Sequence, residues 1–181
     1  MPKIWLTSDL HFNHNKDFLY EPRGFNNIEE MNKTIIAHFN EVVSPEDTVY
    51  VLGDLIMGED HSIGLKYIEQ LNGNLYITIG NHDTNTKIEE YKTLSNVRDV
   101  QFGYRIKYKK WEWLLTHYPT LVANGEDPKP VMNLHGHTHS TERFEFPHCY
   151  NVNPEAHNNY PVLIDDIKLE IQENNKIKYI K

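Results

Sequence analysis

Cysteine is nearly absent from this chain: Cys149 is the only one among 181 residues, so no disulfide can form within it. A lone cysteine of this kind fits a reducing compartment and is most often a small buried apolar side chain. The sequence also lacks any hydrophobic run long enough to span a bilayer. Residues 1–3 lead straight into strand-like sequence, without the apolar region of a signal peptide. We therefore expect a cytoplasmic protein without a membrane partner.

Positive charge is scarce as well, with 18 Lys and Arg against 26 Asp and Glu and a formal net charge of -8. Broad binding to duplex nucleic acid depends on Lys and Arg that displace counterions from phosphates, so this balance argues against it. Basic and aromatic residues do alternate at 107–111, a pattern more typical of a solvated β-hairpin than of a nucleic-acid patch. A phosphate substrate is not excluded, because bound divalent cations would offset the acidity where it docks.

Length and hydrophobic periodicity predict one domain, spanning residues 1–181, of the α/β class. Strand and helix patterns alternate in the first half, and strand patterns dominate after Asn96. The expected strands cover residues 3–8, 48–52, 75–79, 97–101, 104–107, 111–116, 131–134 and 149–152. The expected helices cover about 28–43 and 62–71, and a short helix or strand is expected near the C-terminal end.

Short polar motifs follow five of these strands directly. Together they supply three carboxylates, five histidines and one amide, which are ligands suited to two divalent ions. The loops at the carboxyl ends of strands are also where open α/β sheets bind ligands. The motifs are Asp9-Leu10-His11, Gly53-Asp54, Gly80-Asn81-His82-Asp83, His117 and Gly136-His137-Thr138-His139.

The first three motifs each suggest a specific chemistry. Asp9 and His11 are two positions apart, so a chain still extended there would direct both side chains toward one ion. The carboxylate of Asp54 can bridge two ions with its two oxygens. In the third motif, the asparagine carbonyl can bind a metal while His82 stays free for proton transfer, and Asp83 could fix the tautomer of His82 or raise its basicity. Taken singly, such residues are usually loop caps, turns or satisfied polar groups, so only their combination indicates a metal site.

In this order and with these spacings, the five motifs resemble those of the calcineurin-like metallophosphoesterase superfamily. The resemblance covers residues 4 to about 166. It implies a four-layer αββα sandwich, in which two mixed β-sheets flanked by helices carry a dinuclear metal site at the carboxyl ends of their strands. Segments outside the motifs, around Arg23-Gly24-Phe25 and Asn159-Tyr160-Pro161, are similar to a small bacterial and phage-type branch of predicted phosphoesterases.

The resemblance also implies two sets of metal ligands that share Asp54. One set is Asp9, His11, Asp54 and His139, and the other is Asp54, Asn81, His117 and His137. His82 would be the catalytic histidine, which remains unligated and protonates the leaving oxygen after attack by a hydroxide held between the ions, with Asp83 as its partner. Nitrogen and oxygen ligands favour Mn²⁺, Fe²⁺, Zn²⁺ or Ni²⁺. Among these the resemblance makes Mn²⁺ the expected activator.

The segments between the motifs are short, with 33 residues between Asp83 and His117 and 19 between His117 and His137. We therefore expect no cap domain and an open site. His14, three residues after His11, is a candidate for substrate contact, with an ordinary surface histidine as the alternative. Arg23 could grip a phosphate of the substrate, with a surface or structural ion pair as the alternative.

Three functions remain compatible with these residues. The leading hypothesis is a phosphodiesterase that acts on small nucleotides or related esters, with nucleic-acid ends as a less favoured substrate. The second is a phosphomonoesterase that acts on a nucleotide, sugar or protein phosphate with the same metals. The third is a non-catalytic metal-binding scaffold. His82 argues against the scaffold, because a protein without turnover can dispense with a proton donor.

Overall fold

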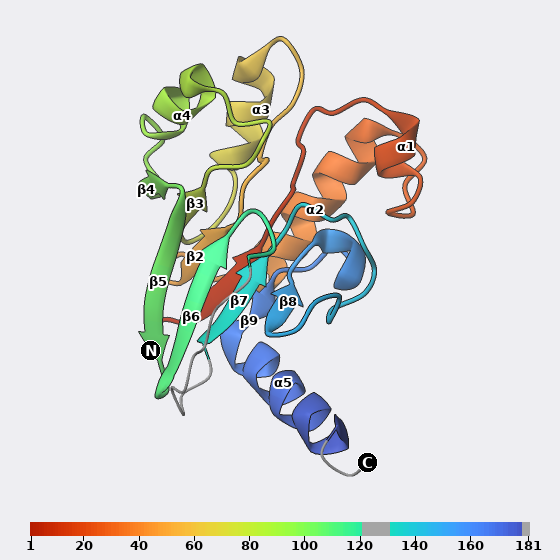
Figure 1. The fold of residues 1–181 in the computed structure, drawn as a ribbon. Helices are drawn as coiled ribbons and strands as arrows, with labels where there is room; N and C mark the ends of the chain where they lie inside the picture. Colours follow the sequence, from red (N-terminus) through yellow and green to blue (C-terminus); the bar gives the residue numbers. More distant parts are fainter. Residues whose placement is uncertain (121–130, 179–181) are drawn as a thin grey trace.

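Two mixed β-sheets form the centre of the fold, and helices flank them (Figure 1). The computed structural model describes residues 1–120 and 131–178. The strands read from the sequence are all present, with ends that differ by at most one residue. The expected fold class is therefore confirmed.

The first sheet has the strand order β4-β3-β2-β1-β9. Its first four strands run parallel, and the short β9 pairs antiparallel with β1 at the edge. The strands are β1 (Ile4–Thr7), β2 (Thr48–Val51), β3 (Asn74–Thr78), β4 (Val97–Gln101) and β9 (Val162–Leu163). Because β1, β2 and β3 are parallel neighbours, the loops after them leave the same edge of the sheet.

The second sheet has the order β5-β6-β7-β8, with β5 and β6 antiparallel and the remaining pairs parallel. Its strands are β5 (Gly103–Tyr108), β6 (Trp111–Thr116), β7 (Val131–His135) and β8 (Cys149–Asn151). Tyr108 pairs with Trp111, and Lys109 and Lys110 between them have φ of 46° and 69°. Two left-handed residues form the usual tight hairpin turn, so residues 107–111 are the solvated β-hairpin that the sequence favoured.

Three helices pack on the outer face of the first sheet and form one hydrophobic core with it. They are α2 (Ile28–Val42), α3 (His61–Ile68) and α4 (Asn85–Tyr91). The side chains of Asn27, Asp60 and Thr84 cap these helices by accepting backbone N–H bonds. The sequence did not predict α4. It is only seven residues long, and its buried residues are Lys87 and Tyr91, so it lacks an apolar stripe.

A second core lies between the two sheets. Consecutive residues of β2 point into opposite cores: Val49 and Val51 pack under the helices, whereas Tyr50 packs against the second sheet. The C-terminal helix α5 (Ile164–Lys178) contributes Ile164 and Ile167 to this second core. The remaining short helices are α1 (Asp17–Tyr20) and the 3-10 helix η1 (Pro154–Ala156).

Cys149 lies in β8 and is buried, with no disulfide, which confirms its predicted role as a small apolar side chain. Burial raises the pKa of this thiol, which keeps it protonated and unreactive. Among the residues that the structure describes, no helix combines the length and apolar character that a membrane crossing requires.

Candidate metal centre

The loops after β1, β2 and β7 bring the first predicted ligand set together. The Nε2 atom of His11 lies 3.7 Å from Asp9 Oδ1 and 3.9 Å from Asp54 Oδ2. The Nε2 atom of His139 approaches the same Asp9 oxygen from the other sheet, at 3.6 Å. Asp9, His11 and His139 thus offer ligand atoms that all lie within 4.8 Å of one another, a spacing that one metal ion could join.

The second predicted set meets at the same Asp54 carboxylate. The Nε2 atom of His117 lies 3.5 Å from Asp54 Oδ2 and 2.8 Å from Asn81 Oδ1. His137 Nδ1 lies 3.0 Å from the same Asn81 oxygen. The N–H of His82 donates to Asp54 Oδ1 at 2.8 Å, so Oδ2 is the Asp54 oxygen that faces both sets. The structure therefore brings all seven predicted ligands into one cluster, with Asp54 Oδ2 beside a histidine of each set.

Five of these side chains are attached to strained backbone. Asp9, His11, Asp54, His137 and His139 have φ between 48° and 73°, in the left-handed region that non-glycine residues rarely occupy. Such strain clusters at functional sites, where the surrounding structure holds it. The expectation that an extended chain aligns Asp9 and His11 is wrong, because β1 ends two residues before Asp9. Left-handed turns bring the two side chains together instead.

Glycines next to the ligands allow the loops to approach one another closely. A Cβ on Gly80 would lie 2.1 Å from Asp54 Oδ1, and a Cβ on Gly136 would lie 2.3 Å from Asp9 Oδ2. Neither contact is compatible with a side chain at the present positions. The glycines in these two motifs thus have a steric role in addition to forming turns.

Several polar atoms at the centre are buried and lack partners. Among the described residues, Asp9 Oδ1 and both ring nitrogens of His11 accept or donate no hydrogen bond. Buried polar atoms are nearly always paired, and unpaired ones cost free energy. Burial raises the pKa of Asp9, but the nearby imidazoles of His11, His117 and His139 outweigh this effect and hold its pKa well below the usual range. Burial lowers the pKa of His11, which favours the neutral form that binds metals.

Residues 2–180 match the family model described as calcineurin-like phosphoesterase. The chain belongs to this family. It is 33% identical over 195 residues to the uncharacterized protein MJ1445 of Methanocaldococcus jannaschii, an alignment that covers 99% of this chain and 97% of the relative. The Gene 66 protein of Mycobacterium phage L5 is 27% identical over 169 residues, which cover 77% of this chain and 79% of the phage protein. The solved structure of AQ665, a protein of unknown function from Aquifex aeolicus, has a TM-score of 0.72 and 23% identity, covering 93% of this chain and 98% of that one.

As a calcineurin-like phosphoesterase, the protein is a hydrolase of phosphate esters that uses divalent metal ions. The donor set described above fits such ions, because it consists of carboxylate, imidazole and amide groups. The unpaired atoms of Asp9 and His11 fit them too, since a cation between these atoms would satisfy both.

We expect Gly80→Ala to lower the melting temperature of this phosphoesterase and to weaken Mn²⁺ binding, because the added methyl group would push Asp54 away. Overpacking of this kind typically costs about 1–3 kcal/mol. Gly64→Ala is the matched control: its methyl group would meet Ile56 at 2.7 Å inside α3 and should lower stability alone. Calorimetry and Mn²⁺ titration of both variants test this prediction. Unchanged Mn²⁺ affinity in Gly80→Ala would contradict it.

The carboxylate of Asp83 fastens the loop of the third motif. Its Oδ2 accepts from the N–H groups of Asp54 and Gly80, both at 2.9 Å, and its Oδ1 accepts from the Tyr91 hydroxyl at 2.8 Å. Groups other than the His82 ring thus occupy both oxygens. The expected pairing of Asp83 with His82 is therefore wrong, and Asp83 instead ties its loop to the Asp54 loop and to α4.

His82 is next to the ligand cluster, yet its ring is open to solvent. Its side chain is 44% exposed, and its Nε2 lies 4.0 Å from Asp54 Oδ2. The ammonium group of Lys87, which is buried, donates to the His82 carbonyl at 2.8 Å and steadies the backbone there. The His82 imidazole could therefore contact a molecule bound beside the Asp54 carboxylate.

The two candidates for substrate contact differ in their surroundings. The ring of His14 lies 5.3 Å from that of His11, and burial together with His11 lowers the pKa of His14 to about 4. His14 remains a prediction as a substrate contact. Arg23 is buried, and it donates to Glu155 Oε1 and to the Asp9 carbonyl, both at 2.8 Å. For Arg23 the structure shows the structural ion pair and not a free guanidinium that could grip a phosphate.

Three side chains near the predicted ligands were not predicted from the sequence. The ring of Tyr118 lies 4.9 Å from that of His117 and 4.6 Å from that of His137. Its position directly after a motif histidine was a signal that could have identified it. Tyr91 belongs to the helix that the sequence did not predict, and Glu155 lies in a segment without a motif, so neither had such a signal.

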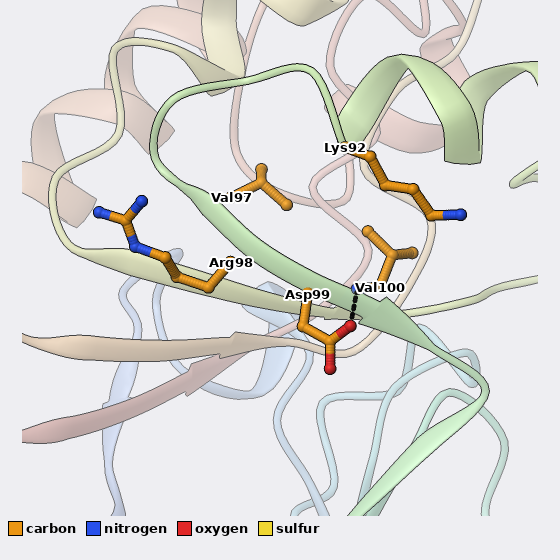
Figure 2. A pocket seen from close by; sticks show the side chains of 5 residues that line it. All are labelled: Lys92, Val97, Arg98, Asp99 and Val100. Carbon is orange, nitrogen blue, oxygen red and sulfur yellow. Dashed lines mark hydrogen bonds between the residues drawn. The ribbon is translucent and has the colours of Figure 1, made fainter.

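A separate pocket of about 230 Å³ lies along the edge strand β4, and none of its lining residues belongs to the five motifs. Figure 2 shows its lining side chains, Lys92, Val97, Arg98, Asp99 and Val100. The polar ones already have local partners. Arg98 donates to Asn74, Lys92 pairs with Glu89, and Asp99 accepts from the backbone N–H of the next residue. This pocket therefore offers no uncommitted polar group to a ligand.

Proposed function

We propose that the protein hydrolyses phosphodiester bonds in small nucleotides or related substrates. The proposal places two divalent ions, with Mn²⁺ favoured, in an open site of a single domain that spans residues 1–181. Their ligands would be Asp9, His11, Asp54, Asn81, His117, His137 and His139.

The position of His82 carries this proposal. Its exposed imidazole lies 4.0 Å from the Asp54 oxygen that both ligand sets share. Hydrolysis of a phosphodiester releases an alkoxide. An alkoxide is a poor leaving group until it gains a proton. One accessible general acid beside the ions meets this need and typically contributes about 10²- to 10⁴-fold to the rate.

The remaining residues divide the other tasks between them. Divalent ions at such a site supply Lewis-acid activation of water and of the phosphate oxygens. Asp54 holds the two ligand sets together, and its Oδ1 anchors the His82 backbone at 2.8 Å. Asp83 fastens that same loop to the Asp54 N–H, so the proton donor and the shared ligand keep a constant spacing.

Hydrolysis of phosphomonoesters is the alternative, since it would use the same ligands. A monoester carries one more negative charge than a diester and gains more from an additional cation. Arg23 was the candidate for that cation, but Glu155 neutralises it inside the protein. This pairing favours the diester. The retained His82 argues against a third possibility, a non-catalytic scaffold.

Turnover of two model esters tests the proposal. With metal-stripped protein and added Mn²⁺, we expect bis-p-nitrophenyl phosphate to be hydrolysed faster than p-nitrophenyl phosphate, and neither to react without metal. Faster hydrolysis of the monoester would indicate that the protein is a phosphomonoesterase. Two bound ions without turnover of either ester, or of a panel of cyclic and linear nucleotides, would favour the scaffold.

A further inference from the structure

Two segments outside the five motifs meet directly behind His139. One follows α1 and carries Arg23, and the other contains η1 and carries Glu155. Arg23 Nε donates to Glu155 Oε1 at 2.8 Å, and the side chain of Asn159 donates to the Arg23 carbonyl at 3.1 Å. The ion pair is internal, because the Arg23 side chain is 0% exposed and that of Glu155 is 6% exposed.

Glu155 binds the ring of His139 on the side away from the metal centre. Its Oε1 lies 2.8 Å from His139 Nδ1, while Nε2 of the same ring lies 3.6 Å from Asp9 Oδ1. A carboxylate at Nδ1 keeps the proton on that nitrogen and leaves the Nε2 lone pair free. The contact therefore selects the tautomer in which His139 can bind a cation beside Asp9.

Arg23 holds the carboxylate in place. Its guanidinium and the Glu155 carboxylate lie 2.8 Å apart and are both almost fully buried, so the carboxylate is confined beside the His139 ring. Arg23 also donates from Nη2 to the Asp9 carbonyl at 2.8 Å. One guanidinium thus connects the backbone of one ligand residue to the carboxylate that orients another.

We propose that Glu155, supported by Arg23, is a positioning residue that fixes the tautomer and orientation of His139 for a divalent cation. This inference rests on the metal site of the proposed function. It assigns a role to segments that lie outside the five motifs, and it concerns only one of the two ions, the one that Asp9, His11 and His139 would hold.

Titration of metal-stripped protein with Mn²⁺, followed by calorimetry, tests the inference without any substrate. We expect Glu155→Gln to weaken one of two binding events about tenfold and to leave the other nearly unchanged, since loss of such an outer partner costs about 10- to 100-fold in metal affinity. Glu170→Gln is the matched control. It breaks another Arg–Glu pair, the 2.7 Å contact of Arg143 with Glu170, which touches no predicted ligand. Both events should be unchanged in this control.

A neutral double variant guards against misfolding. Glu155→Ala alone would leave Arg23 buried and unpaired, so Arg23→Met/Glu155→Ala removes both charges together. We expect this variant to melt cooperatively and to weaken the same binding event about 100-fold. Nitrogen-15 NMR of metal-stripped protein should show His139 protonated at Nδ1 in the wild type and a mixture of ring states in the double variant. A purely structural ion pair would leave this signature unchanged.

The outcomes separate the two proposals. If the wild type binds two Mn²⁺ ions and Glu155→Gln and the folded double variant bind both with wild-type affinity, the positioning role is overturned while the metal site stands. If the wild type itself binds no Mn²⁺, the metal site of the proposed function fails. Selective weakening of one event, with the altered His139 signal, supports the inference.

Discussion

Replacing Asp54 with alanine is expected to abolish divalent metal binding and phosphoester hydrolysis together. Its Oδ2 lies 3.9 Å from His11 Nε2 and 3.5 Å from His117 Nε2, so this one oxygen faces a histidine of each predicted ligand set. Metal ions supply several kcal/mol of transition-state stabilisation, and about 1.4 kcal/mol corresponds to a factor of ten. We therefore expect the rate to fall by at least about a thousandfold. Metal analysis of the purified variant and hydrolysis of bis-p-nitrophenyl phosphate measure both effects.

Asp47→Ala provides the matched control for Asp54→Ala. Asp47 is also a buried carboxylate, but it lies before β2, at the opposite end of the strand, and accepts from the Lys3 N–H and the Trp5 indole. Its removal should lower the melting temperature and leave both ions bound. If Asp54→Ala retained two ions, or if both variants lost metal equally, Asp54 would not be the shared ligand.

His82→Ala is expected to keep both metal ions and to lose about 10²- to 10⁴-fold in rate, because it removes only the proton donor. The ring is 44% exposed, so its loss should cost little stability. Calorimetric Mn²⁺ titration and kcat for bis-p-nitrophenyl phosphate separate the two effects. Metal loss equal to that of Asp54→Ala would contradict the assignment.

A comparison of esters with different leaving groups tests the role of His82 as a proton donor more directly. A general acid matters more when the departing oxygen is more basic, so the loss in His82→Ala should be larger for a dialkyl-type diester than for the p-nitrophenyl ester. His61→Ala is the control, because the His61 ring pairs with Glu90 between α3 and α4 and touches no predicted ligand. An equal loss for both esters would mean that His82 acts in some way other than by protonating the leaving oxygen.

Much of this fold could be read from local patterns. Apolar runs such as residues 48–51 marked the strands, and hydrophobic periodicity over about residues 28–43 marked α2. Because parallel strands end at one edge of a sheet, the motifs after β1, β2 and β3 were expected to lie close together. The grouping of all five motifs around Asp54 came from the resemblance to the calcineurin-like family.

Other features depended on contacts between distant segments. Hydrophobic periodicity did not predict α4, because this helix is short and its inner face is polar. Its Tyr91 nevertheless donates a hydrogen bond to Asp83. For Arg23 the sequence left both a phosphate contact and an ion pair open, because its partner, Glu155, is 132 residues away. Neighbours that sequence spacing does not reveal therefore decided the roles of Asp83 and Arg23.

The sequence alone determined the α/β class, the order of the strands along the chain, and the residue types available for two divalent ions, since these follow from periodicity, turn chemistry and ligand preference. Only the tertiary structure decided the left-handed turns that bring Asp9 and His11 together, the single Asp54 oxygen that both ligand sets face, and the Arg23–Glu155 pair behind His139. The physical reason is that backbone strain, close approach at glycines and buried ion pairs arise from packing between loops, and not from the local sequence of any one of them.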